Sequence, residues 1–128
     1  MADGGNAIGR YAGVMAYPVP ASWFAEALEP LGTTFGERLI FSHDGPVARW
    51  SYDGHAAIVE LGRADRITAR FVARPAIDAI SGRPAAPVYA GEADGYPLTR
   101  AGCERMVTDM VAFFSGIREP RFTFVATR

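Results

Sequence analysis

The residues best suited to chemistry are a tyrosine, an aspartate and a histidine around one short turn. Tyr52, Asp53 and His55 follow one another in the segment Trp-Ser-Tyr-Asp-Gly-His. If Asp53 and Gly54 form a two-residue hairpin turn, Tyr52 and His55 lie directly opposite each other. Such a trio at the mouth of an aromatic face could perform general acid–base chemistry. We favour the plainer interpretation, a cross-strand pair that closes the core, with Asp53 serving the turn.

The second histidine, His43, raises the question of a metal site, because paired histidines often bind metal ions. The register derived below places His43 and His55 about 20 Å apart along the sheet, so we expect no shared ion. His43 and Asp44 are explained by a strand end and a turn. Cys103 is the only cysteine, and we expect a small buried hydrophobe there rather than a nucleophile. We therefore expect neither a metal nor a cofactor.

Arginines form a third group, on one face of the predicted sheet. The chain contains no lysine, so every strong cation is an arginine. Arg49 and Arg70 are expected on either side of Ile58, about 9–10 Å apart at the backbone, with Arg38 nearby. Guanidinium groups so arranged can hold a carboxylate or a phosphate. The alternatives are a solvated face and a face covered by protein.

Apolar residues on the same face favour a protein cover. Ile40, Ile58 and Val72 share it with the arginines. Large apolar side chains on a second sheet face indicate that another layer packs there. We expect either the segment 74–98 or a second subunit, which would make the protein a homodimer through this face.

The elements that position these residues are four short strands in an antiparallel meander. Asp-Gly pairs at 44–45 and 53–54 and a loop at 62–66 separate β-type runs, as hairpin turns do. The predicted strands are 37–43, 47–52, 55–61 and 67–73.

The three turns agree on a single buried face, which is why we trust the sheet. Their pairings join residues that point to the same side, as a pleated sheet requires. Large and small side chains alternate along two rows of this face. One row is Leu39, Trp50, Ala57 and Phe71, and the other is Phe41, Ala48, Val59 and Ala69.

The remaining elements complete an α+β fold in one domain, residues 1–128. We expect helices with apolar stripes at about 22–31 and 100–115, packed on one face of the sheet, with Thr99 as the N-cap of the second. Pro75 could open a short helix through Ser81. The other expected segments are a frayed end at 1–7, strands at 8–17 and 120–127, and a long Pro/Gly/Ala-rich loop at 74–98.

Composition excludes several classes of protein. About half of the residues are hydrophobic and the formal net charge is −1, which gives no general attraction to nucleic acid or to anionic membranes. The uncharged stretch 11–25 is interrupted by prolines and is too short to span a bilayer. We expect a soluble, cytoplasmic protein.

Two hypotheses of function remain. We favour a non-enzymatic binding module, dimeric, for a small apolar or acidic ligand or a protein partner. The alternative is a small acid–base enzyme of the isomerase, cyclase or lyase type, which would use Tyr52, Asp53 and His55 beside an aromatic pocket. The expected ligand-binding residues are Arg38, Arg49, Arg70, Trp50, Tyr89 and Tyr96.

Overall fold

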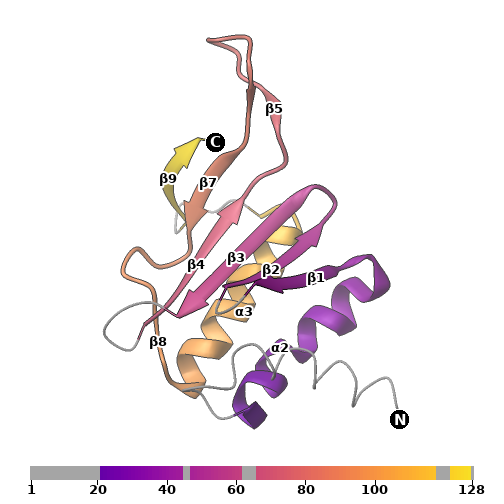
Figure 1. Ribbon diagram of the computed structural model, residues 1–128, viewed down its shortest axis with the longest axis vertical. Coiled ribbons are helices and arrows are strands. Elements are labelled where there is room, and N and C mark those ends of the chain that lie inside the picture. Colours follow the sequence, from indigo (N-terminus) through magenta and orange to yellow (C-terminus); the bar gives the residue numbers. More distant parts are fainter. Residues whose placement is uncertain (1–20, 45–46, 62–65, 118–121, 128) are drawn as a thin grey trace.

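The computed structural model describes residues 21–44, 47–61, 66–117 and 122–127. Within them the protein is α+β, with one antiparallel sheet and two long helices on the same face of that sheet (Figure 1). This confirms the expected fold class and the one-sided helix layer. The predicted frayed end at 1–7 and strand at 8–17 lie outside the described residues.

The main sheet follows the predicted meander and then adds strands from the second half of the chain. Its strands are β1 (Ile40–Asp44), β2 (Val47–Tyr52), β3 (His55–Leu61), β4 (Arg66–Val72), β7 (Pro87–Ala90), β8 (Tyr96–Pro97) and β9 (Thr123–Thr127). Their order across the sheet is β1-β2-β3-β4-β7-β9, and β8 pairs with β4. A separate hairpin pairs β5 (Ala76–Ile77) with β6 (Pro84–Ala85). The helices are α2 (Ala21–Phe35) and α3 (Arg100–Phe114), and a 3-10 turn, η1 (Gly36–Arg38), follows α2.

The helix α3 is capped at both ends, and Thr99 is its N-cap as predicted. The Thr99 side chain accepts a hydrogen bond from the backbone N–H of Gly102 at 3.0 Å, which satisfies one of the free donors of the first turn. At the other end Gly116 has a φ of 90°, the conformation that commonly ends a helix.

The helix α2 runs past its predicted end at 31. Leu28, Leu31 and Phe35 are all buried, so packing favours another helical turn beyond Leu31. Gly36, with a φ of 61°, ends the helix. Gly32 lies inside the helix, and the strand expected from 37 begins only at Ile40.

The second and third hairpins have the predicted register. Trp50 pairs with Ala57, and Ala57 pairs with Phe71. Asp53 and Gly54 have φ values of 50° and 82°, as the expected two-residue turn requires.

The first hairpin is shifted by two residues from the prediction. Phe41 pairs with Trp50 instead of Ala48, and His43 pairs with Ala48. The strand continues through Asp44, which was expected in the turn and instead pairs with Val47. Because side chains alternate with a period of two, this shift leaves every residue of strand β1 on its predicted face. It reduces the separation of the two histidines along the strand to about 13 Å.

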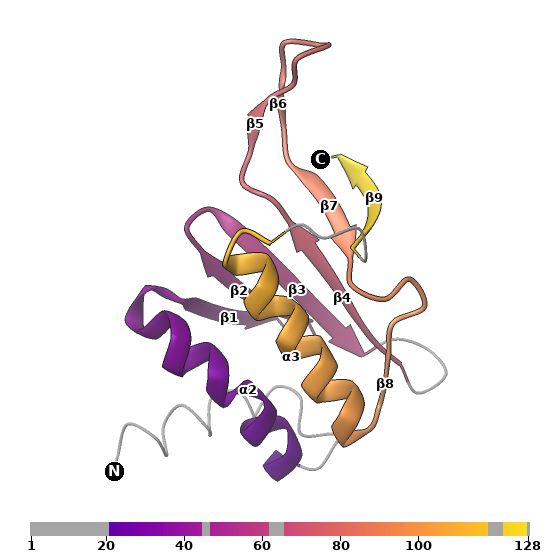
Figure 2. The same ribbon diagram turned by 180° about the vertical axis from the view of Figure 1, so that it is seen from behind.

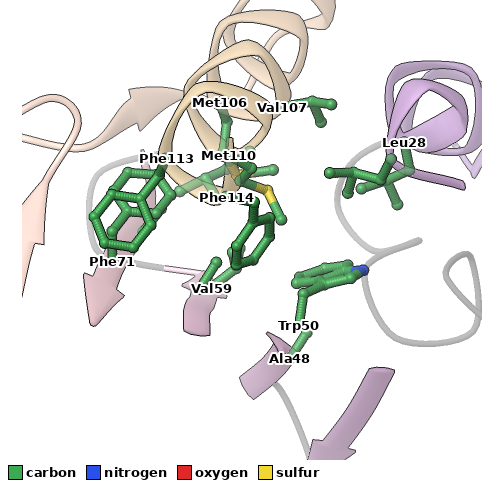
Figure 3. Close-up of a cluster of buried hydrophobic side chains, with 14 of the residues drawn as sticks. Leu28, Ala48, Trp50, Val59, Phe71, Met106, Val107, Met110, Phe113 and Phe114 are labelled. Atoms are coloured by element: carbon green, nitrogen blue, oxygen red, sulfur yellow. The ribbon is translucent and has the colours of Figure 1, made fainter. Parts of the chain in front are cut away.

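The core lies between this sheet face and the two helices (Figure 3). Trp50 and Phe71 are fully buried, and Phe71 stacks on Phe113 of α3 with ring centroids 5.2 Å apart. In Figure 3, Met110 and Phe114 of α3 fill the space above Val59. The large side chains of the helices thus pack into the spaces that the small residues leave between the large ones on the sheet.

Residues 75–81 do not form the predicted short helix, because they belong to the β5–β6 hairpin. The carboxylate of Asp78 accepts hydrogen bonds from the backbone N–H groups of Ile80 and Ser81. Such local bonds compete with helical hydrogen bonding and favour a turn. Pro84 and the positive φ of Gly82 also suit a hairpin.

A small apolar cluster lies at one end of the second sheet face. Ala56 and Val72 form a small buried cluster with Ala86 and Val88, and Ile58 packs partly against it. Ala86 and Val88 come from the segment 74–98, and Val88 pairs with Val72 inside the same sheet, so it extends this face and forms no separate layer over it.

Candidate functional site

The predicted pair of Tyr52 and His55 is present, and both side chains make structural contacts. His55 and Tyr52 are directly paired across β2 and β3. The Nδ1 atom of His55 accepts a hydrogen bond from the backbone N–H of Arg74 at 2.8 Å, so in the neutral ring the proton is on Nε2. Asp53 lies 3.5 Å from the Arg74 guanidinium. Both residues therefore hold the chain where it leaves β4.

The side chain of Tyr52 packs against aromatic residues on the helix side of the sheet. Its ring lies 4.6 Å from the ring of Phe35 and 6.2 Å from that of Phe114, measured between centroids. The guanidinium of Arg38 lies 5.2 Å from the centroid of the Tyr52 ring, at cation–π distance. Arg38 is thus on the face opposite Arg49, and its expected place beside that residue is wrong.

The other predicted ligand residues do not converge on one site. Arg49, Ile58 and Arg70 are aligned across three strands as expected, and Arg70 lies 4.0 Å from Glu60. Trp50 is fully buried in the core, where a ligand cannot reach it. Tyr89 is half-buried against Phe113 and Phe124.

Tyr96, the last of that set, is part of a buried polar pair that sequence reasoning missed. Its hydroxyl donates a hydrogen bond to Oδ2 of Asp109 at 2.5 Å, and the two residues are 0% and 1% exposed. A carboxylate so deeply buried requires strong hydrogen bonds. This pair therefore ties β8 to the middle of α3.

The absence of a side chain at Gly91 leaves space for the Tyr96–Asp109 pair. A Cβ atom at this position would lie far inside contact distance of the Tyr96 hydroxyl, 2.8 Å from Asp109 Oδ2 and 3.1 Å from Phe71. Only glycine lets the backbone approach so closely.

A cleft of about 520 Å³ opens beside the Tyr96–Asp109 pair, between α3 and the start of the segment after β7. Arg105 and Glu92 form its charged wall, joined by two hydrogen bonds of 2.8 and 3.2 Å. The hydrogen bond and charge of Glu92 raise the pKa of Arg105 further above its usual range. The cleft is lined by Gly91, Glu92, Ala101, Glu104, Arg105, Thr108 and Asp109.

The cleft exists because the chain leaves the sheet at this point. β4 pairs with β7 through Arg70–Val72 and with β8 through Arg66–Ile67. The segment between β7 and β8, residues 91–95, therefore lies outside the ladder. A smaller cleft of about 290 Å³ lies against the same segment, and Glu92 lines both. Neither of these two clefts is lined by Tyr52, Asp53 or His55.

One signal in the sequence could have found Asp109. It follows Met106 by three positions and precedes Phe113 by four, so it falls on the apolar stripe of the predicted helix. An acidic residue on a buried stripe needs a donor. The long loop contains two tyrosines, but nothing local indicates which one reaches it.

Within the described ranges, no three His, Cys, Asp or Glu side chains lie close enough to hold a metal ion together. No helix of these ranges is long and apolar enough to cross a membrane. No family model, curated protein or solved structure matches the chain.

Proposed function

We propose that this protein is a non-enzymatic binding module, whose small ligand occupies the cleft beside Asp109. The observation that carries the proposal is the cleft itself, about 520 Å³ in volume, with the buried Tyr96–Asp109 pair next to it. This volume falls in the usual range for small-molecule sites, about 300–1,000 Å³. The pair fixes α3 against β8, so the cleft wall is rigid before a ligand arrives.

The lining favours a ligand that carries a cationic or hydroxyl group. Glu92 and Arg105 compensate each other's charge. Glu104 and Asp109 add two further carboxylates to the lining, and Glu104 is only loosely paired with Arg100, at 3.9 Å. This balance attracts hydrogen-bond donors and disfavours the acidic ligand expected from the sequence.

The alternative of an acid–base enzyme has less support. Asp53 and the Nδ1 atom of His55 are both engaged with Arg74, and Tyr52 packs among aromatic rings. A catalytic base must face a space in which a substrate fits.

The test is a thermal-shift screen of small amines, polyols, carboxylates and apolar compounds, followed by calorimetric titration of each stabilising compound. Thr108→Trp fills the cleft and should weaken binding at least tenfold. Thr33→Trp is the matched control, because both threonines are exposed on a helix and donate to the carbonyl four residues earlier. The proposal fails if no amine or polyol binds, or if Thr108→Trp binds as well as Thr33→Trp does.

A further inference from the structure

The β5–β6 hairpin forms an arm that extends beyond the rest of the molecule. Figures 1 and 2 show it projecting past both helices and past the end of the sheet. Its two large apolar side chains are exposed to solvent, Ile77 at 69% and Ile80 at 98%. A single exposed isoleucine needs no explanation, whereas several at one end of a molecule indicate an interaction surface.

The tip of the arm is an ordered turn. The Asp78 carboxylate accepts hydrogen bonds from the backbone N–H groups of Ile80 at 2.7 Å and Ser81 at 2.9 Å. The N–H of Gly82 donates to the Asp78 carbonyl at 2.8 Å, and the Asp78 N–H donates to the carbonyl of Arg83. Ile80 is therefore presented on a fixed backbone, which lowers the entropic cost of burying it against a partner.

The strand β9 adds two more apolar side chains at the same end. Phe124 is 58% exposed and Val125 is 54% exposed. Val125 has no pairing partner on β7, because the register shifts there. An irregular edge of this kind resists further strand pairing, so we expect side chains, not backbone ladders, to make the contact.

We infer that the arm and β9 together form the interface of a homodimer, in which a second copy of this chain is the occupant. The four exposed side chains would bury on the order of 500 Å² per copy, less than the roughly 800 Å² per partner of standard interfaces, which fits a weak dimer. β9 has no charged residue, and Asp78 and Arg83 are the only charges of residues 75–86.

These charges suit a twofold contact between identical arms. In such a contact each residue meets its partner reciprocally, so the Arg83 guanidinium can approach the partner subunit's Asp78 while Asp78 meets the partner subunit's Arg83. The arm as a whole carries no net charge, and self-association costs no net repulsion. The same surface would offer a strongly charged partner little attraction.

This interface differs from the one expected from the sequence, which used Ile40, Ile58 and Val72. Val72 is only 5% exposed and Ile58 packs against the chain's own cluster. Ile40 remains 65% exposed, but it lies on β1, at the opposite edge of the sheet from β9.

The experiment is sedimentation equilibrium of the full chain over a concentration series. The molecular mass of the wild type should approach twice the 13.8 kDa of one chain. Ile80→Asp should raise the dimer dissociation constant at least 100-fold, because an anchor is lost from both copies at once. Ile40→Asp, at another exposed isoleucine far from the arm, should leave the constant unchanged. Circular dichroism checks that both variants are folded.

A second variant separates charge from packing. Arg83→Asp places two carboxylates on each arm and should weaken the dimer at least tenfold, with a smaller effect at high salt. A monomeric wild type overturns the inference, as does a dimer that Ile80→Asp leaves intact. A dimer broken by Ile40→Asp would place the interface on the opposite edge. The ligand screen of the cleft does not depend on any of these outcomes.

Discussion

Replacing Gly91 with alanine tests how closely the chain is held against the buried Tyr96–Asp109 pair. The added Cβ atom would overlap the Tyr96 hydroxyl and lie 2.8 Å from Asp109 Oδ2. Tyr96 is fully buried, and its hydroxyl is already 2.5 Å from the carboxylate. The ring therefore has no open space to move into, and we expect the hydrogen bond to break.

The magnitude follows from two separable costs. Overpacking a well-filled site costs about 1–3 kcal/mol, and losing a hydrogen bond to a charged group costs about 1.5–3 kcal/mol. Gly91→Ala should therefore lower the free energy of unfolding by the sum of the two, about 2.5–6 kcal/mol. Tyr96→Phe alone should cost only the second amount. Because both changes act on one hydroxyl, the double variant should lose less than the sum by at least about 1 kcal/mol.

The assay is equilibrium unfolding in urea, followed by tryptophan fluorescence with the buried Trp50 as a reporter and by circular dichroism. Gly32→Ala is the control, because it adds the same methyl group inside α2 with no atom within 4 Å. It should be neutral or stabilising by about 0.5–1 kcal/mol. A loss below about 1 kcal/mol for Gly91→Ala, or strict additivity with Tyr96→Phe, would refute the close approach.

Three further predictions concern local groups. Thr99→Ala removes the acceptor for the Gly102 N–H, so the free energy of unfolding should fall by about 1 kcal/mol in the same urea assay. Burial and, to a lesser extent, the charge of Glu104 raise the pKa of the Cys103 thiol; labelling by a thiol reagent should be slow in the folded protein and fast in urea. Hydrogen bonds from the backbone N–H groups of Ser81 and Ile80 lower the pKa of Asp78 below its ordinary 3.8. Its stabilisation of the arm should be complete above that value and disappear as pH falls through the lowered pKa, which NMR titration of the carboxyl carbon measures.

The sheet could be predicted because its determinants are local in sequence. The turn at Asp53-Gly54 needs two positive φ values, which these residue types tolerate, and that turn fixes Trp50 opposite Ala57. In the first hairpin the turn was misplaced, and the register moved by two residues. The strand residues were nevertheless assigned to the correct sheet faces, because side chains alternate with a period of two and a shift of two residues does not change the side on which each one lies.

The cleft depends instead on residues that are distant in sequence. The arm depends on residues whose types are compatible with more than one local structure. Pro75 is compatible with a helix start, and only the Asp78 hydrogen bonds commit the next residues to a turn.

Asp109 illustrates the same limit for the candidate site. Its position on the apolar stripe demands a buried donor, but the choice between Tyr89 and Tyr96 depends on where the chain leaves the sheet after β7. Gly91 permits that departure, since a side chain there would occupy the place of the Tyr96 hydroxyl. A cleft whose walls come from residues 91–92 and 101–109 therefore has no signature in any one stretch of sequence. The cleft depends on the tertiary structure, in which β4 pairs with β7 along one part of its length and with β8 along another.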